Sequence, residues 1–127
     1  MNKKILLIIR IIIAIILIQT LRYKFTAHPD SVYIFSQVGL EPYGRIGIGV
    51  LELITAILIL IPKTIWAGAA LTFGIIAGAV FMHLTMLGIE INHDNGALFY
   101  LALTVFILSG IVLFQHRKEI PFIGKMF

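Results

Sequence analysis

The chain has 127 residues, of which 60% are hydrophobic and 13% are charged, and its mean hydropathy is +1.04. A water-soluble domain of this length needs far more polar surface, so the composition excludes that class and indicates an integral membrane protein. The net charge is +4, but most Lys and Arg residues stand at the ends of hydrophobic runs, where membrane topology explains them without a nucleic-acid partner.

Four hydrophobic runs are each long enough to cross a bilayer about 30 Å thick at about 1.5 Å per residue. They predict an all-α integral membrane protein, a four-transmembrane-helix bundle that forms a single membrane domain. The runs cover about residues 5–21, 43–61, 64–89 and 97–114.

The first run resembles a signal peptide because Lys3 and Lys4 precede it. However, Arg10 interrupts the run and no cleavage site of small residues follows, so we predict a retained span. Pro62 and Lys63 leave almost no loop between the second and third spans, which must form an antiparallel hairpin.

Basic residues gather on the side of the predicted bundle that holds both termini, and most acidic residues fall on the other side. By the positive-inside rule, both termini are expected to face the cytoplasm, with the protein integral to the bacterial inner membrane.

The segment between the first two spans has its own helical pattern, since Val32, Phe35 and Val38 recur at helical spacing. It predicts a short amphipathic interfacial helix over about residues 30–38. Lys24, just past the first span, is expected to anchor that span at the interface.

Glycines mark the second and third spans. Gly74 and Gly78 form a GxxxG pattern, which predicts a face where two helices pack closely, and Gly47 and Gly49 are expected to act in the same way.

The second span carries a carboxylate, Glu52, near its middle, where an acid costs about 2–4 kcal/mol in a bilayer. Counting along the helices places Glu52 roughly 10 Å and His83 roughly 9 Å below the outer surface. We therefore predict that these two residues form one ligand-binding or proton-handling site, with Gln19 and Arg10 in support. Arg45 shares a helix face with Glu52, so a cavity that opens outward is expected here.

Each of these residues also has a structural interpretation. Glu52 equally fits an ion-paired or neutralised strut that fixes helix register, and His83 a structural hydrogen bond. For Arg10, snorkelling to the interface or a structural pair is favoured, and for Gln19 an interhelical hydrogen bond.

Cysteine is absent from the sequence, which excludes disulfides, thiol nucleophiles and Cys-ligated metal ions or clusters. Any redox role would therefore use a bound cofactor, such as a quinone, or a partner protein. His83, His93 and Glu52 lack the spacing of metal ligands, so we predict no metal site.

Four stretches resemble the DoxX family of small four-span membrane proteins: RYKFT at 22–26, SVYIFS at 31–36, GLEPYGRIGIGVLEL at 39–53 and FMHLTMLGI at 81–89. The Lys-Phe-Thr after the first span and the glutamate of the second are the more specific parts. The resemblance implies a four-helix bundle with a short outer helix. Its relatives include the small membrane subunit of a thiosulfate:quinone oxidoreductase, a mycobacterial membrane-associated oxidoreductase complex and, more distantly, a receptor chaperone.

The leading hypothesis is an accessory subunit, or a binder of a quinone or other small hydrophobic ligand, linked to membrane redox metabolism. In it, Glu52 and His83 bind the head group or relay a proton. The alternatives are a non-catalytic membrane assembly factor or chaperone and a small-solute transporter. Expected partners are the lipid bilayer and either another membrane protein or a second copy of the chain.

Overall fold

The structure, a computed structural model, describes residues 2–91 and 95–121. Its long helices are α1 (Lys3–Phe25), α3 (Tyr43–Leu60), α4 (Ile65–Met82) and α5 (Ala97–Gln115). Helices α1, α3 and α5, and the segment Pro62–Leu87 that contains α4, are each long and apolar enough to cross a membrane. The prediction of an all-α bundle with four spans is therefore confirmed.

Short helical elements join the spans. Helix α2 (Pro29–Gln37) follows α1, the 3-10 turn η1 (Pro62–Thr64) links α3 to α4, the π-helix η2 (His83–Leu87) extends α4, and the 3-10 turn η3 (Arg117–Glu119) follows α5.

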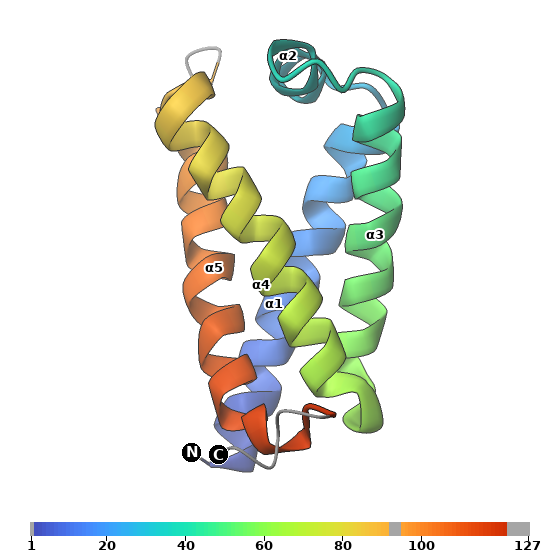
Figure 1. Cartoon of the computed structure of the whole chain (residues 1–127), viewed down its shortest axis with the longest axis vertical. Helices are drawn as coiled ribbons and strands as arrows, with labels where there is room; N and C mark the ends of the chain where they lie inside the picture. The colour runs from blue at the N-terminus through green and yellow to red at the C-terminus, as the bar shows by residue number, and fades with distance from the viewer. Residues whose placement is uncertain (1, 92–94, 122–127) are drawn as a thin grey trace.

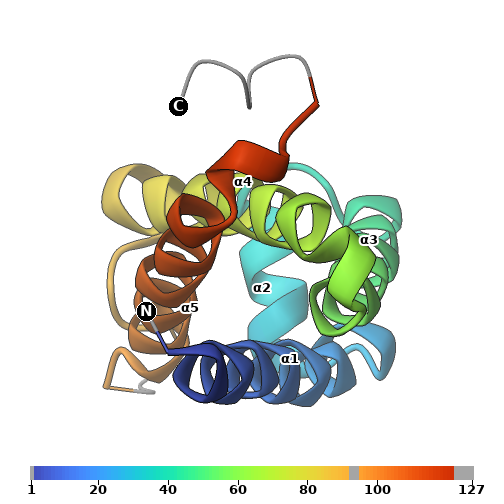
Figure 2. The same cartoon turned by 90° about the horizontal axis from the view of Figure 1, so that it is seen from below.

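The four spans form a ring in which α1 packs on α3, α3 on α4, α4 on α5 and α5 on α1 (Figure 2). Helix α2 lies across one end of this ring, which we call the α2 end (Figure 1). The start of α1, the α3–α4 connection and the end of α5 lie at the opposite end, which we call the terminal end. The even number of spans accounts for this arrangement.

The tightly packed core runs from the middle of the bundle to the terminal end. Branched aliphatic and small side chains fill it, and all four spans contribute. Its most buried members are Ile13 and Leu17 of α1, Ala56 and Ile59 of α3, Ala69 of α4, and Val105 and Val112 of α5.

The outward faces of the spans are also apolar. Ile15, Phe81 and Ile107 are each more than half exposed. Such a surface is suited to contact with lipid chains, as expected for helices that cross a bilayer.

Two helix boundaries differ from the predicted ones in ways that matter for the site. Helix α1 continues one turn past residue 21 to Phe25, so Lys24 is part of the span and not an anchor beyond it. The third span is α-helical only to Met82 and then continues as a π-helix to Leu87. Gly88, at φ +79°, ends it, because this left-handed backbone conformation carries little penalty for glycine.

The short helix of the first loop lies close to its predicted range. Pro29 fits its first turn, and a ring nitrogen of His28 accepts a hydrogen bond from the Asp30 amide at 3.1 Å. Ser31 and Phe35, four residues apart, form its buried face. Helix α2 thereby covers the α2 end of the ring.

The glycine pattern of α4 does not do what the sequence predicted. A Cβ atom added to Gly68 would lie 2.5 Å from the backbone nitrogen of Ile59, so Gly68 is where α4 and α3 pack closely. A Cβ atom added to Gly74 or Gly78 would meet nothing within 4 Å. The prediction that this GxxxG pair is a packing face is therefore wrong, since both glycines border open space.

Candidate functional site

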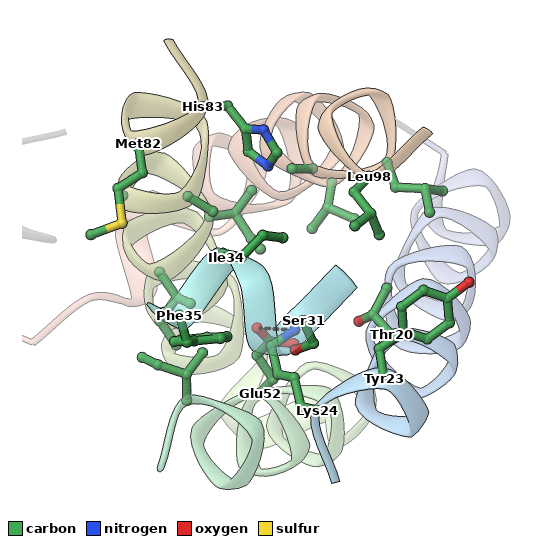
Figure 3. A pocket seen from close by; sticks show the side chains of 18 of the residues that line it. Thr20, Tyr23, Lys24, Ser31, Ile34, Phe35, Glu52, Met82, His83 and Leu98 are labelled. Atoms are coloured by element: carbon green, nitrogen blue, oxygen red, sulfur yellow. Dashed lines mark ion pairs between the residues drawn. The ribbon is translucent and has the colours of Figure 1, made fainter. Parts of the chain in front are cut away.

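The half of the bundle nearer the α2 end encloses a cavity of about 350 Å³ (Figure 3). All four spans, α2 and the π-helix contribute to its walls, which are mainly aliphatic and aromatic. A small set of polar side chains interrupts this apolar lining: Thr20, Tyr23, Lys24, Ser31, Glu52 and His83. An apolar cavity with a few placed polar groups is the usual composition of a small-molecule site.

Glu52 is paired with Lys24 inside this cavity. The Lys24 Nζ atom of α1 lies 3.2 Å from the Glu52 Oε1 atom of α3, and Figure 3 marks this ion pair. Glu52 is only 4% exposed, and the Lys24 side chain is 15% exposed. Burial of two charges is tolerable here because each is the counter-charge of the other.

The second carboxylate oxygen of Glu52 is left without a partner. Among the described residues, two buried side-chain oxygens have no hydrogen-bond partner: Glu52 Oε2 and the Thr72 hydroxyl oxygen. Of these two residues, Glu52 lines the cavity. A buried acceptor without a donor costs about 1–3 kcal/mol, and more when it is charged, so a donor from a bound molecule would be favourable at this oxygen.

Gly49 brings Lys24 within reach of Glu52. A Cβ atom at Gly49 would lie 2.8 Å from the Phe25 ring and 3.4 Å from the Lys24 Cβ atom. Because glycine has no Cβ atom, the end of α1 can lie against α3 here. Glu52 is three residues further along α3 on nearly the same face. The predicted packing role is thus confirmed for Gly49, whereas an added Cβ at Gly47 would meet nothing within 4 Å.

Arg45 links the end of α1 to the start of α3 on the side of the α2 end. Its Nε atom donates to both carboxylate oxygens of Glu41, at 2.9 and 3.0 Å. Its Nη1 atom donates to the backbone carbonyl of Lys24. Arg45 therefore holds the last turn of α1 against the start of α3, and it does not line the cavity.

His83 occupies another wall of the cavity, and Figure 3 shows it across from Glu52. Its Nδ1 atom lies 2.9 Å from the carbonyl oxygen of Gly88. Because a carbonyl only accepts, Nδ1 carries the proton, and in the neutral ring Nε2 is left as an acceptor. The ring also meets Phe99 edge-on, with 5.5 Å between centroids.

The change of helix type at His83 adds to the evidence for a site. The π-helix starts at this residue, and single π turns within α-helices occur frequently at functional sites. The Gly88 carbonyl that contacts His83 lies just beyond the π turn, at a residue whose φ angle is positive. The histidine ring is thus oriented by its own helix end.

The structure places the predicted site residues in two groups. Glu52 and His83 line one cavity, but the partner of Glu52 is Lys24. Arg10 lies far from them, at the terminal end, where its Nε and Nη2 atoms donate to the carbonyls of Ile59 and Leu60 at 2.8 and 3.0 Å. Gln19 is on the exposed side of α1 and does not line the cavity.

Lys24 lines the cavity, although its place in the sequence predicts an interfacial anchor. The signal for it was present, because Ile13, Leu17, Thr20 and Lys24 follow one another at spacings of four, three and four residues along a single face of α1. The predicted end of the first span at residue 21 cuts this stripe short of Lys24. Ser31 and Thr20 gave no separate signal, since hydroxyl residues are common in helices of membrane proteins.

Among residues 2–91 and 95–121, no three His, Asp or Glu side chains lie close enough together to hold a metal ion. His93, considered above, lies outside the described residues. The polar groups of the cavity are one ion pair, one histidine and several hydroxyls, which suit hydrogen bonding to an organic molecule.

These features define the class of protein: a small integral membrane protein whose four spans surround a cavity with a buried ion pair. The model of the DoxX-like family matches residues 8–108, from the first turns of α1 into α5, and the chain belongs to this family. Lys24, Glu52 and His83 all fall within the matched region. Comparison with curated proteins and with solved structures gave no match.

Proposed function

We propose that the protein binds a small membrane-soluble molecule in this cavity, with its polar head at Glu52 and Lys24, and that the ligand is a quinol. The observation that carries the proposal is the Glu52 Oε2 atom, a buried acceptor without a hydrogen-bond donor, on a residue that lines an apolar cavity. In this role the protein is an accessory component of membrane redox metabolism.

The head of a quinol matches the hydrogen-bonding groups of the cavity. A quinol carries two hydroxyl donors on one aromatic ring, and Glu52 Oε2 and His83 Nε2 both accept. An oxidised quinone offers acceptors alone, so it engages Lys24 and leaves Oε2 unsatisfied. The reduced form is therefore expected to bind more tightly than the oxidised form.

Orientation in the membrane follows from the charges at the two ends. Lys3, Lys4, Lys63, Arg117 and Lys118 all belong to elements at the terminal end. Under the positive-inside rule this end faces the cytoplasm of a bacterium, with the protein in the inner membrane. The cavity then lies in the outer half of the bilayer.

An assembly factor would be expected to expose Glu52 differently. A carboxylate that contacts the helices of client proteins would be exposed along the side of the bundle, whereas Glu52 is 4% exposed and faces inward. This burial favours the ligand-binding role.

The test is binding of dimethoxydimethylhydroquinone, a quinol ring without a tail, to the purified protein under anaerobic conditions. We expect saturable binding by calorimetry, and weaker binding of the corresponding oxidised quinone. Glu52→Gln exchanges a charged acceptor for a neutral one, which lowers affinity by about tenfold.

Glu41→Gln is the matched control, since Glu41 pairs with Arg45 and does not line the cavity. It should leave the affinity within about twofold, well below the tenfold step that corresponds to about 1.4 kcal/mol. Absence of binding to the unaltered protein, or equal affinity in Glu52→Gln, would refute the proposal.

A further inference from the structure

The cavity has an opening through the side of the bundle at Gly74 and Gly78. Both glycines line the cavity, and both are exposed on the face of α4 that also carries the exposed side chains of Leu71 and Phe81. A side chain at either position would meet nothing within 4 Å, so neither is covered by a neighbouring helix. Positions that belong at once to the cavity wall and to the outer surface mark the edge of an opening.

This opening lies between α3 and α4. On α4, Phe73 faces α5, where it stacks on Phe106 with 4.6 Å between centroids. Gly74 and Gly78 are about 100° and 140° away from Phe73 around the helix, on the side away from α5. Figures 1 and 2 show α3 and α4 close together at their connection and spreading apart toward the α2 end, and Ile48 of α3 lines the same cavity.

The depth of the opening determines what it faces. Gly74 stands about halfway along the 26-residue span Pro62–Leu87. The middle of a span lies in the hydrocarbon core, so the opening leads to lipid chains and not to water. Exposed apolar residues such as Leu71 and Leu51 flank this face on α4 and α3.

The size of the cavity limits what fits inside it. A volume of about 350 Å³ is near the lower end of the range of about 300–1,000 Å³ for small-molecule sites. It accommodates a single ring or a head group, and a long aliphatic chain would have to leave it.

We infer that the ligand is a long-tailed lipid, whose head lies at Glu52 and whose tail passes between α3 and α4 beside Gly74 and Gly78 into the bilayer. This inference rests on the proposed function for the identity of the head. Two independent observations support it: the uncovered glycines at mid-span, and the buried, unpartnered Oε2 atom of Glu52, a residue that lines the same cavity. The lack of side chains at the two glycines keeps the passage open for the tail.

The test compares two probes that share a fully substituted ring: dimethoxydimethylhydroquinone, which has no tail, and decylubiquinol, which has a ten-carbon tail. The double variant Gly74→Leu/Gly78→Leu fills the opening with side chains that have free space around their Cβ atoms. We expect its affinity for decylubiquinol to fall by about tenfold or more, while its affinity for the tail-less ring stays within about twofold. Leu71→Phe, an exposed change on α4 outside the cavity lining, should alter neither affinity.

The outcomes separate the two proposals. Unchanged decylubiquinol binding in the double variant, with the tail-less ring still bound, overturns the side passage and leaves the head site intact. Equal loss for both probes also overturns it, because the leucines would then occupy the head site. Failure of the unaltered protein to bind the tail-less ring overturns both proposals.

A second measurement does not depend on the bulky variant. The chain has no cysteine, so Gly78→Cys introduces a single thiol at the opening. In liposomes, we expect a bilayer-soluble maleimide to modify this thiol faster than a sulfonated, water-soluble one. Decylubiquinol should slow the modification several-fold, whereas the tail-less ring should not, and modification at the same rate with either probe would overturn the inference.

Discussion

The terminal half and the α2 half of the bundle place the same residue types in opposite surroundings. In the terminal half, Gly68 lies against the backbone of α3, whereas in the middle of the same helix Gly74 and Gly78 border a cavity. The buried charges differ in the same way. Arg10 donates to two carbonyls at the end of α3, but Glu52 has one paired and one unpaired oxygen.

From this difference, we expect the two halves to serve separate purposes. In the terminal half, close approach and satisfied hydrogen bonds hold the helices together, so changes there should act on stability. In the α2 half, the space at the two glycines and the free acceptor contribute little to packing, so changes at the glycines and at that acceptor should act mainly on ligand binding, and only the ion pair there should affect stability. The predictions below test that division by comparing matched substitutions in the two halves.

The largest effect is expected for Gly68→Leu. Its Cβ atom would meet Ile59 backbone atoms at 2.5 and 2.8 Å, and backbone cannot rotate away as a flexible side chain can. We expect the free energy of unfolding to fall by about 3 kcal/mol, the upper end for an overpacked site. Reversible unfolding in mixed micelles measures it. Gly74→Leu is the matched change and should cost less than about 1 kcal/mol; equal losses would contradict the division into halves.

Arg10→Met should come next. The substitution keeps an unbranched apolar stem but removes the donors to the Ile59 and Leu60 carbonyls, and hydrogen bonds to charged groups contribute about 1.5–3 kcal/mol. We expect a loss of about 2–3 kcal/mol in the same unfolding assay, with ligand affinity unchanged. Arg10→Lys, which keeps the charge but not the forked donor geometry, should recover part of the loss. A change in quinol affinity would show that Arg10 acts on the site after all.

Lys24→Met removes the counter-charge of Glu52. Loss of one partner of a buried pair typically costs about 3–5 kcal/mol, and we expect about 2 kcal/mol because the Lys24 side chain is partly exposed. The double variant Lys24→Met/Glu52→Gln should regain much of this stability, since no uncompensated charge remains. Lys63→Met, at an exposed position of η1, serves as the control. Additive effects of the two substitutions would show that the pair is not coupled.

The smallest effect is a gain. Alanine is favoured over glycine within helices by about 0.5–1 kcal/mol, and a Cβ atom at Gly74 or Gly78 has free space. Gly78→Ala should therefore raise the free energy of unfolding by about 0.5 kcal/mol. Gly68→Ala should lower it, although the chemical change is identical. If both substitutions shift stability in the same direction, the open and the packed parts of α4 are not distinct.

Much of the fold was readable in the sequence because the bilayer imposes strong constraints on a chain. Backbone groups in hydrocarbon must be satisfied within a helix, so long apolar runs predict spans. The short helix of the first loop was also readable, since Val32 and Phe35 stand at helical spacing and Pro29 starts a helix. The same reasoning identified Glu52 and His83 as unusual, because polar groups at that depth are costly.

The pairing of these residues was not readable in the same way. A first span that ends at residue 21 leaves Lys24 outside the bundle. However, the α1 helix continues to Phe25 and is capped only at Thr26. One added turn carries Lys24 into the bundle, and the missing side chain at Gly49 lets it approach Glu52. Whether a glycine brings helices together or leaves space depends on the neighbouring helix, which a single sequence does not record.

By itself, then, the sequence determined the class of protein and the number of spans, and it singled out Glu52 and His83, which line one cavity, because burial of polar groups in lipid is governed by composition and depth. The tertiary structure decided the partner of Glu52, the hydrogen-bond partners of Arg10 and Arg45, and the opposite surroundings of Gly68 and Gly74. These depend on how α1, α3 and α4 cross one another. The crossing is set by contacts between residues far apart in the chain, at Gly49 and Gly68, and not by any local pattern.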